Sequence, residues 1–205
     1  MCKYKHFCRD FMAEKEKTLY IISGCNGAGK TTASMTILPD VLDCQEFVNA
    51  DEIARGLSPF NPEGVSIAAG RLMLDRINQL LEGEDSFAVE TTLSARTYSR
   101  FVHRAHAHGF RVHLIFFWLK SPEAAILRVA QRVQEGGHNI PRDVVIRRYY
   151  MGLNNLFSLF MPIVDMWILY DNSDMSKVCI ATGGKNLHTE VYNNEIFNEI
   201  QNNVC

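Results

Sequence analysis

The sequence lacks an excess of charge of either sign. Its 205 residues hold 21 lysines and arginines against 23 aspartates and glutamates, a formal net charge of −2. Proteins that bind nucleic acid through bulk electrostatics need a basic surface, so this composition predicts no nucleic-acid partner. Long hydrophobic runs are absent too, because the longest, residues 114–119, is far too short to cross a bilayer. We therefore expect no membrane association.

Cysteine motifs and a secretory signal are also missing. No two cysteines have a zinc-site or CxxC spacing, and the first seventeen residues contain neither an apolar core nor a cleavage signature. These features predict free thiols in a reducing compartment, and thus a soluble cytoplasmic protein. The six cysteines are Cys2, Cys8, Cys25, Cys44, Cys179 and Cys205.

Short apolar runs alternate with amphipathic stretches along most of the chain. The pattern predicts strands at residues 18–23, 46–49, 86–89, 111–119 and 166–170, and a weaker one at 178–182. Helices are predicted from the glycine-rich segment to Leu38, where Pro39 should end the helix, and at 62–81, 94–108, 121–134, 142–160 and near 195–201. Such alternation is typical of an α/β fold, in which helices cover both faces of a parallel sheet.

The chain length favours one domain with short extensions. We expect an N-terminal extension over residues 1–17, a main domain over 18–175, and a C-terminal tail over 176–205 that packs on the same domain.

The first predicted strand leads directly into a phosphate-binding motif. Residues 24–31, GCNGAGKT, fit the P-loop pattern GxxxxGK[ST]. Its glycines allow consecutive backbone N–H groups to face phosphate oxygens, Lys30 reaches the β- and γ-phosphates, and the Thr31 hydroxyl ligates Mg²⁺. We therefore predict ATP or GTP binding by Gly24, Asn26, Gly27, Ala28, Gly29, Lys30, Thr31 and Thr32.

Polar side chains follow the second and third predicted strands. Asp51 is placed to accept the proton of a substrate hydroxyl, or alternatively to cap the turn that follows it. Glu90 can hold a magnesium-bound water or bind two sugar hydroxyls, with Arg96 one turn further on for an anionic substrate group. The alternative for this segment is helix capping by Thr92 or Ser94.

Five arginines lie within twenty-one residues, on both sides of a glycine-rich break. A helix–break–helix of this kind suits a lid that closes over a transferring phosphoryl group, and we rank Arg132 and Arg147 first. The alternative is a solvated face paired with Glu123, Glu135 and Asp143. The five are Arg128, Arg132, Arg142, Arg147 and Arg148.

Two further groups have weaker signals. The histidines at 103, 106, 108 and 113 have irregular spacing, which favours surface residues over a metal site. Cys25 is oxidisable in principle, but nothing near it in sequence lowers its pKa apart from the helix start.

Taken in order, these segments resemble the small zeta-toxin-like P-loop kinases. The resemblance covers about residues 18–173 and rests on IISGCNGAGKTT, FVNADEIARGLSPF, SFAVETTLS, LIFFWLKSPEAAILRVAQRV, GGHNIPRDVVIRRYY and LYDNS. It implies a nucleoside-monophosphate-kinase-like fold with a five-stranded parallel sheet. It also implies phosphorylation of a hydroxyl of UDP-N-acetylglucosamine, and inhibition by an antitoxin protein that blocks the ATP site.

The resemblance also implies roles for single residues. Lys30 and Thr31 would bind ATP and magnesium, Asp51 would be the general base, and Arg132 with Arg147 would clamp the γ-phosphate. Glu90 and Thr92 would bind the sugar nucleotide, and Asp171 and Asn172 would lie near the adenine. Arg96 stands farther behind the Glu-x-Thr element than the arginine of the family's toxins.

Our prediction is thus an ATP- and Mg²⁺-dependent small-molecule kinase with a sugar nucleotide as acceptor. A kinase of another nucleoside or dinucleotide hydroxyl is an alternative within the same class. A nucleotide-binding ATPase or regulatory module without an acceptor is the alternative from another class.

Overall fold

The sheet at the centre of the molecule has seven strands in the order β2-β3-β1-β4-β5-β6-β7. The computed structural model describes residues 16–137, 139–174 and 177–204, so Cys2, Cys8, Cys205 and nearly all of the 1–17 extension lie outside the described residues. The strands are β1 (Thr18–Gly24), β2 (Glu46–Val48), β3 (Phe87–Thr91), β4 (Arg111–Trp118), β5 (Met166–Asp171), β6 (Val178–Gly184) and β7 (Leu187–Val191).

The predicted α/β class is confirmed, and the predicted strand count of five is wrong. The first five strands pair in parallel as expected, but β6 adds to β5 in antiparallel fashion and β7 adds to β6. The sequence pattern missed β7 because this edge strand is exposed along nearly its whole length, so apolar residues do not alternate in it. β1 and β4 are buried on both faces, which explains their continuous apolar runs.

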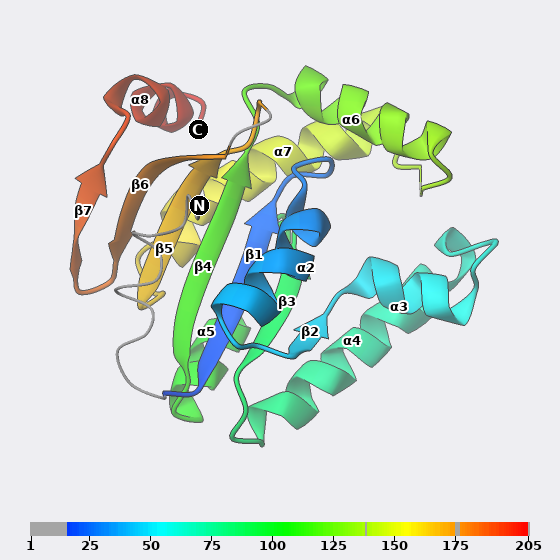
Figure 1. Cartoon of the computed structure of the whole chain (residues 1–205), viewed down its shortest axis with the longest axis horizontal. Helices are drawn as coiled ribbons and strands as arrows, with labels where there is room; N and C mark the ends of the chain where they lie inside the picture. Colours follow the sequence, from blue (N-terminus) through cyan, green and yellow to red (C-terminus); the bar gives the residue numbers. More distant parts are fainter. Residues whose placement is uncertain (1–15, 138, 175–176, 205) are drawn as a thin grey trace.

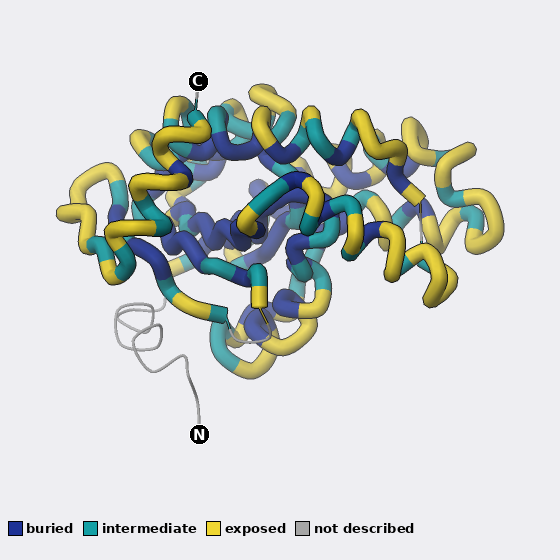
Figure 2. The backbone as a smooth tube through the Cα atoms, turned by 90° about the horizontal axis from the view of Figure 1, so that it is seen from above, coloured by how far each residue is buried: buried dark blue, intermediate teal, exposed yellow. Residues whose placement is uncertain are grey.

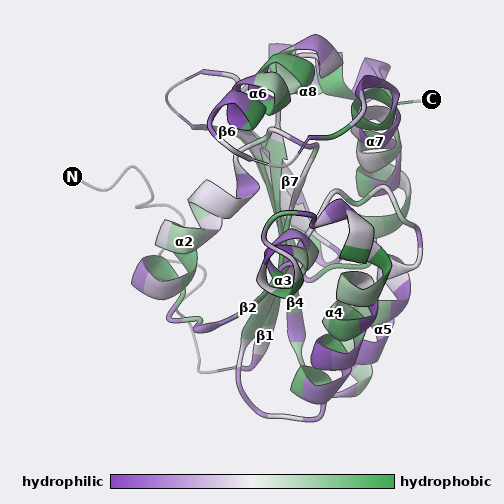
Figure 3. Cartoon of the chain, turned by 90° about the vertical axis from the view of Figure 1, so that its right-hand side faces the viewer, coloured by the Kyte–Doolittle hydropathy of each residue, from purple (hydrophilic) through white to green (hydrophobic). Residues whose placement is uncertain are grey.

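Helices cover both faces of the sheet. In Figures 1 and 3, α2 lies on one face, while α4, α5 and α7 lie on the other. Figure 2 shows buried chain at the centre and exposed chain mainly at the periphery. The helices are α2 (Lys30–Val41), α3 (Ala50–Leu57), η1 (Glu63–Val65), α4 (Ser66–Leu81), α5 (Tyr98–Ala107), α6 (Pro122–Gln134), α7 (Arg142–Asn155) with its π-helical continuation η2 (Leu156–Phe160), and α8 (Asn194–Asn202).

Side-chain caps mark the starts of three helices, α3, α6 and α8. Ser121 caps α6 by accepting a hydrogen bond from the Ala124 N–H at 3.1 Å, with Pro122 at the first helical position. The prediction that Pro39 ends α2 is wrong, because the helix continues to Val41. A proline in the last turn removes a single bond, from its own nitrogen to the Met35 carbonyl, which a helix end tolerates better than a helix centre.

The strand order determines where a ligand binds. β1 and β4 are neighbours in the sheet. The connection after β1 leads to β2, on the β3 side, whereas the connection after β4 leads to β5, on the other side, so the two connections diverge at the carboxyl ends of β1 and β4. Open parallel sheets bind ligands at such a switch point. Within the described ranges, no helix combines the length and apolar character needed to cross a membrane.

A buried carboxylate joins several elements at the opposite end of the sheet. The side chain of Asp165 is 7% exposed and accepts hydrogen bonds from Lys185 Nζ at 2.8 Å, the Val112 N–H at 2.8 Å and His106 Nε2 at 2.7 Å. Burial alone would raise the pKa of Asp165, but these donors outweigh it and lower the pKa to about 2. The carboxylate therefore stabilises the fold when it is ionised.

We expect Asp165→Asn to destabilise the protein by about 1 to 2 kcal/mol at pH 7. Because the folded-state pKa lies below the unfolded value, this contribution is complete above about pH 4 and is lost as the pH falls toward 2. Urea unfolding of the variant and the wild type at pH 7 and pH 3 measures both effects, with Asp75→Asn, an exposed position on α4, as the control. An equal stability loss in the two variants would contradict the assignment.

Candidate active site

The predicted P-loop connects β1 directly to α2. Its glycines Gly24, Gly27 and Gly29 have φ angles of 139°, 78° and 77°. Glycine is required at position 24 for space as well, since a Cβ atom there would overlap the Phe117 carbonyl oxygen of β4. Asn172 Nδ2 donates to the Ala28 carbonyl at 2.7 Å, so the end of β5 fixes the loop from the other side. The loop is therefore held in shape by its neighbours before any ligand binds.

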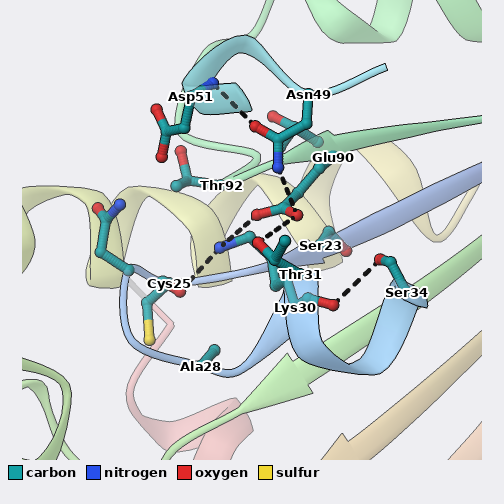
Figure 4. Close-up of polar contacts among 12 residues, drawn as sticks. Ser23, Cys25, Ala28, Lys30, Thr31, Ser34, Asn49, Asp51, Glu90 and Thr92 are labelled. Carbon is teal, nitrogen blue, oxygen red and sulfur yellow. Dashed lines mark hydrogen bonds and ion pairs between the residues drawn. The ribbon is translucent and has the colours of Figure 1, made fainter. Parts of the chain in front are cut away.

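Lys30, Thr31 and Glu90 meet beside this loop (Figure 4). Lys30 is 7% exposed; its Nζ donates to the Cys25 carbonyl at 3.1 Å and lies 3.6 Å from Glu90 Oε1. The Thr31 hydroxyl donates to Glu90 Oε2 at 2.8 Å. The structure thus brings a cation, a hydroxyl and a carboxylate together at the start of α2, where the positive end of the helix dipole adds to the attraction for phosphate.

Asp51 lies at the beginning of α3, with its side chain exposed. The helix cap is Asn49, whose Oδ1 accepts from the Asp51 N–H at 2.8 Å and from the Glu52 N–H at 3.4 Å. The alternative that Asp51 is an N-cap is therefore wrong, because its carboxylate takes no part in the cap. This carboxylate is left available for chemistry.

Thr92 and Ser94 belong to a loop between β3 and α5. Their hydroxyls lie 2.8 Å apart, and neither caps a helix, since α5 begins only at Tyr98. The helix-capping alternative is therefore wrong for this segment as well. Leu93 between them is completely buried and has a φ of 55°, a left-handed conformation that is strained for leucine.

Helix α7 holds this strained loop in place. Asn155 Nδ2 donates to the Leu93 carbonyl at 2.7 Å, and Gly152 packs so closely that an added Cβ would lie 2.6 Å from the Thr92 carbonyl oxygen. Strained backbone persists only where its surroundings determine it, and such segments cluster at functional sites. The loop after Glu90 is therefore built to a fixed shape.

We expect Gly152→Ala to destabilise the protein by about 1 to 3 kcal/mol, because backbone must move to admit the methyl group. The matched control is Gly70→Ala, in the second turn of α4, where an added Cβ meets nothing within 4 Å. That control should gain about 0.5 to 1 kcal/mol from helix propensity. Urea unfolding of the two variants measures the difference, and a neutral Gly152→Ala would show that the loop is not packed as described.

A cavity of about 560 Å³ opens beside the P-loop. Its lining includes Thr31 from α2, Asp51 from α3 and Arg132 from α6. The remainder of the wall comes from α3, η1, the start of α4 and the end of α6, with charged side chains at Glu52, Arg55, Glu63 and Glu135. Arg55 Nη1 lies 3.4 Å from Glu52 Oε1, so these two neutralise each other. The volume is within the range of small-molecule binding pockets.

The arginines around the break are not equivalent. Arg132 lines the cavity, whereas Arg147 is exposed on α7. Its neighbour Arg148 is half-buried and donates to Asn26 Oδ1 of the P-loop at 3.3 Å, and Arg128 donates to the Ser173 carbonyl at 2.7 Å. Arg148 therefore contacts the P-loop itself, whereas Arg128 contacts the segment just after β5, next to Asn172.

The remaining predicted residues lie around this centre. Glu90 contacts Thr31 as described, and neither it nor Thr92 is among the residues that line the cavity. Arg96 is exposed ahead of α5 and is also outside the lining set. Asp171 accepts from the Ser173 N–H at 2.8 Å, next to Asn172.

The surroundings of Cys25, His106 and His113 are typical of residues that stabilise the fold. Burial raises the pKa of the Cys25 thiol to about 11, although Lys30 and Arg128 act against the rise, so this thiol is not activated. Burial lowers the pKa of His113 to about 4, and His106 pairs with Asp165. Among the described residues, no group of three or more His, Cys, Asp or Glu side chains is placed to hold a metal ion.

Sequence reasoning missed Asn49, Gly152 and Asn155. A signal existed for Asn49, because asparagine is a preferred N-cap and it stands directly before a helix start. No local signal identified Gly152 or Asn155, since their partners lie some sixty residues away in the chain.

Known structures with this fold include ATP-bound and toxin–antitoxin proteins. The complex of AvrRxo1-ORF1 and AvrRxo1-ORF2 with ATP superposes with a TM-score of 0.75 at 22% identity, over 90% of this chain and 63% of that one. The chain thus spans less than two thirds of that protein. The PezAT toxin–antitoxin system of Streptococcus pneumoniae matches with a TM-score of 0.67 at 15% identity, over 97% of this chain and 90% of that one. These likenesses show a shared fold.

Sequence comparisons supply the family. An uncharacterized protein of Haemophilus influenzae (strain ATCC 51907 / DSM 11121 / KW20 / Rd) is 32% identical over 126 residues, which cover 62% of this chain and 88% of that protein. The family model described as zeta toxin matches residues 5–161, well over half of the chain, and includes the P-loop, Asp51, Glu90 and the arginines of α6 and α7. The chain therefore belongs to the zeta toxin family, a family of P-loop kinases.

Proposed function

We propose that this protein transfers the γ-phosphoryl group of ATP to a hydroxyl group of a small molecule. The observation that supports the proposal is the cavity, because Thr31 of the P-loop, Asp51 and Arg132 all line it. Phosphoryl transfer requires a group that holds the nucleotide, a group that receives the acceptor proton and cations that offset charge on the transferring phosphoryl. In our proposal the P-loop holds the nucleotide, Asp51 receives the proton and Arg132 is one of the cations.

The residues at the P-loop fit magnesium as well as phosphate. Mg²⁺ prefers oxygen ligands, and the Thr31 hydroxyl and Glu90 carboxylate are oxygen donors that already lie 2.8 Å apart. Bound there, Mg²⁺ would offset negative charge on the β- and γ-phosphates. Lys30 contributes a buried positive charge at the same point.

The acceptor side is the cavity beside Asp51. In the proposed step the acceptor hydroxyl oxygen forms a bond to the γ-phosphorus, the bond from that phosphorus to the β–γ bridging oxygen breaks, and ADP leaves. Asp51 accepts the hydroxyl proton. Arg132 offsets the charge on the transferring group, and Arg148 and Arg147 on α7 are the cations that a closing lid would bring closer.

UDP-N-acetylglucosamine is the first acceptor that we propose, because the chain belongs to the zeta toxin family and the resemblance to that family implies this acceptor. A kinase of another hydroxyl, such as that of a nucleoside or a dinucleotide, is the second candidate. One observation favours the second candidate: Thr92 and Arg96, expected on the sugar-nucleotide side, are outside the set of residues that line the cavity. The likeness to a toxin–antitoxin structure also supports a protein antitoxin as partner.

The test is incubation with γ-labelled ATP, Mg²⁺ and a panel of acceptors that includes UDP-sugars, nucleosides and dinucleotides. We expect label on one acceptor class, and at least about 100-fold slower labelling with the Asp51→Asn variant. Label that appears only as free phosphate would overturn the kinase proposal in favour of an ATPase. Growth of cells that express the wild type or Asp51→Asn tests toxicity separately.

A further inference from the structure

Asn49 uses both ends of its side chain at the active site. It is 6% exposed and lies between β2 and α3. Its Oδ1 accepts from the backbone N–H groups of Asp51 and Glu52, and its Nδ2 donates to Glu90 Oε2 at 2.8 Å. The orientation of the amide follows from its partners, because N–H groups only donate and an ionised carboxylate only accepts.

Glu90 connects this asparagine to the nucleotide side of the site. The oxygen that accepts from Asn49 also accepts from the Thr31 hydroxyl, and the second oxygen of the carboxylate lies 3.6 Å from Lys30 Nζ. Figure 4 shows the resulting chain of contacts from Asp51 through Asn49 and Glu90 to the start of α2. One buried amide therefore links the backbone that carries Asp51 to the carboxylate that faces the P-loop.

Capping alone does not explain asparagine at this position. Aspartate, serine and threonine cap helices about as well, but an asparagine amide alone adds a donor at the other end of the cap. The same protein provides the comparison: Asn193 caps α8 by accepting from the Ile196 N–H at 3.1 Å, far along the chain from the P-loop. The feature that separates Asn49 from an ordinary cap is its contact with Glu90.

We propose that Asn49 is a positioning residue. It holds the Glu90 carboxylate in the orientation that suits the magnesium–nucleotide complex, and it also fixes the start of α3, which carries Asp51. This inference rests on the proposed function for the role of Asp51, whereas its effect on nucleotide binding is independent of any acceptor. Without the Nδ2 donor, the Glu90 carboxylate loses one of the three side-chain contacts that orient it and keeps only those with Thr31 and Lys30. Residues that orient metal-binding groups in this way typically change metal affinity by about 10- to 100-fold when they are replaced.

The decisive variant is Asn49→Ser, which keeps a capping oxygen and removes the donor, with Asn193→Ser as the matched control. Calorimetry with a non-hydrolysable ATP analogue, in excess EDTA and then in excess Mg²⁺, gives the gain in affinity that Mg²⁺ provides. We expect Asn49→Ser to bind within threefold of the wild type in EDTA and to lose at least about tenfold of the Mg²⁺-dependent gain. Asn193→Ser should leave both affinities unchanged.

Turnover and stability complete the test. If label transfer to water or to an acceptor is measurable, kcat of Asn49→Ser should fall about tenfold while KM for ATP in Mg²⁺ rises. Asn49→Ala, which removes cap and donor together, should unfold at a lower temperature than Asn49→Ser but lose a similar Mg²⁺-dependent gain. An unchanged gain in Asn49→Ser, or an equal loss of affinity in EDTA and in Mg²⁺, would overturn the proposal. Failure to find any acceptor would defeat the proposed function and leave this binding result standing.

Discussion

Lys30→Ala is expected to weaken ATP binding by at least about 100-fold, or roughly 3 kcal/mol. Lys30 is almost completely buried, and its ammonium group lies between the Cys25 carbonyl at the P-loop and the Glu90 carboxylate. Removing the cation takes away an attraction for the β- and γ-phosphates. It also leaves the 10%-exposed Glu90 carboxylate without its positive neighbour and close to the approaching phosphates. Both changes act in the same direction, and calorimetric titration with Mg²⁺–ATP measures their sum.

Two controls separate this effect from loss of the fold. Lys30→Met keeps the apolar stem of the side chain and removes only the charge, so it should lose affinity while remaining folded by circular dichroism. Lys17→Ala removes a lysine at the amino end of β1, where its Nζ pairs with Glu84 at 3.0 Å, and should leave ATP binding unchanged. A folded Lys30→Met that binds ATP within threefold of the wild type would show that the P-loop does not bind the nucleotide as proposed.

The part of the fold that sequence could predict is the part set by local patterns. Continuous apolar runs revealed β1 and β4 because both strands are buried on both faces. The run from Ser121 to Pro122 revealed the start of α6 through capping chemistry. The sequence pattern does not reveal β7, because this exposed edge strand has no buried, apolar face. It also places the end of α2 too early, because a helix tolerates a proline in its last turn.

For the candidate site, too, sequence predicts the location better than the individual contacts. Residues just after β1, β2 and β3 could be expected to meet because the carboxyl ends of neighbouring parallel strands share one edge of the sheet. The single contacts within that edge were harder to predict. Asparagine and aspartate are both preferred N-caps, so the signal at Asn49 did not exclude Asp51, and the choice of Arg148 over Arg147 as the P-loop contact depends on helix phase at single-residue precision. A sequence pattern identifies the segment that contributes to the site, whereas tertiary packing determines which of two nearby side chains in that segment makes the contact.

Asp51→Asn is expected to lower phosphoryl transfer by about 100-fold or more while ATP binding stays within threefold of the wild type. The substitution keeps the size and shape of the side chain but removes its ability to accept the proton of an acceptor hydroxyl. The cap of α3 should survive, because it uses the backbone N–H of residue 51 and the side chain of Asn49. Nucleotide binding should survive as well, because Lys30 and the P-loop are untouched.

The neighbouring residue supplies a stringent control for this prediction. Glu52 is also an exposed carboxylate on the first turn of α3, and it lines the same cavity. Glu52→Gln therefore removes an equal charge at nearly the same place, and any purely electrostatic effect on the bound nucleotide should appear in both variants. A loss of turnover confined to Asp51→Asn assigns the proton transfer to that one carboxylate, because only its role in the reaction then distinguishes the two. Equal turnover in Asp51→Asn and the wild type, with label transferred to the same acceptor, would remove Asp51 from the mechanism.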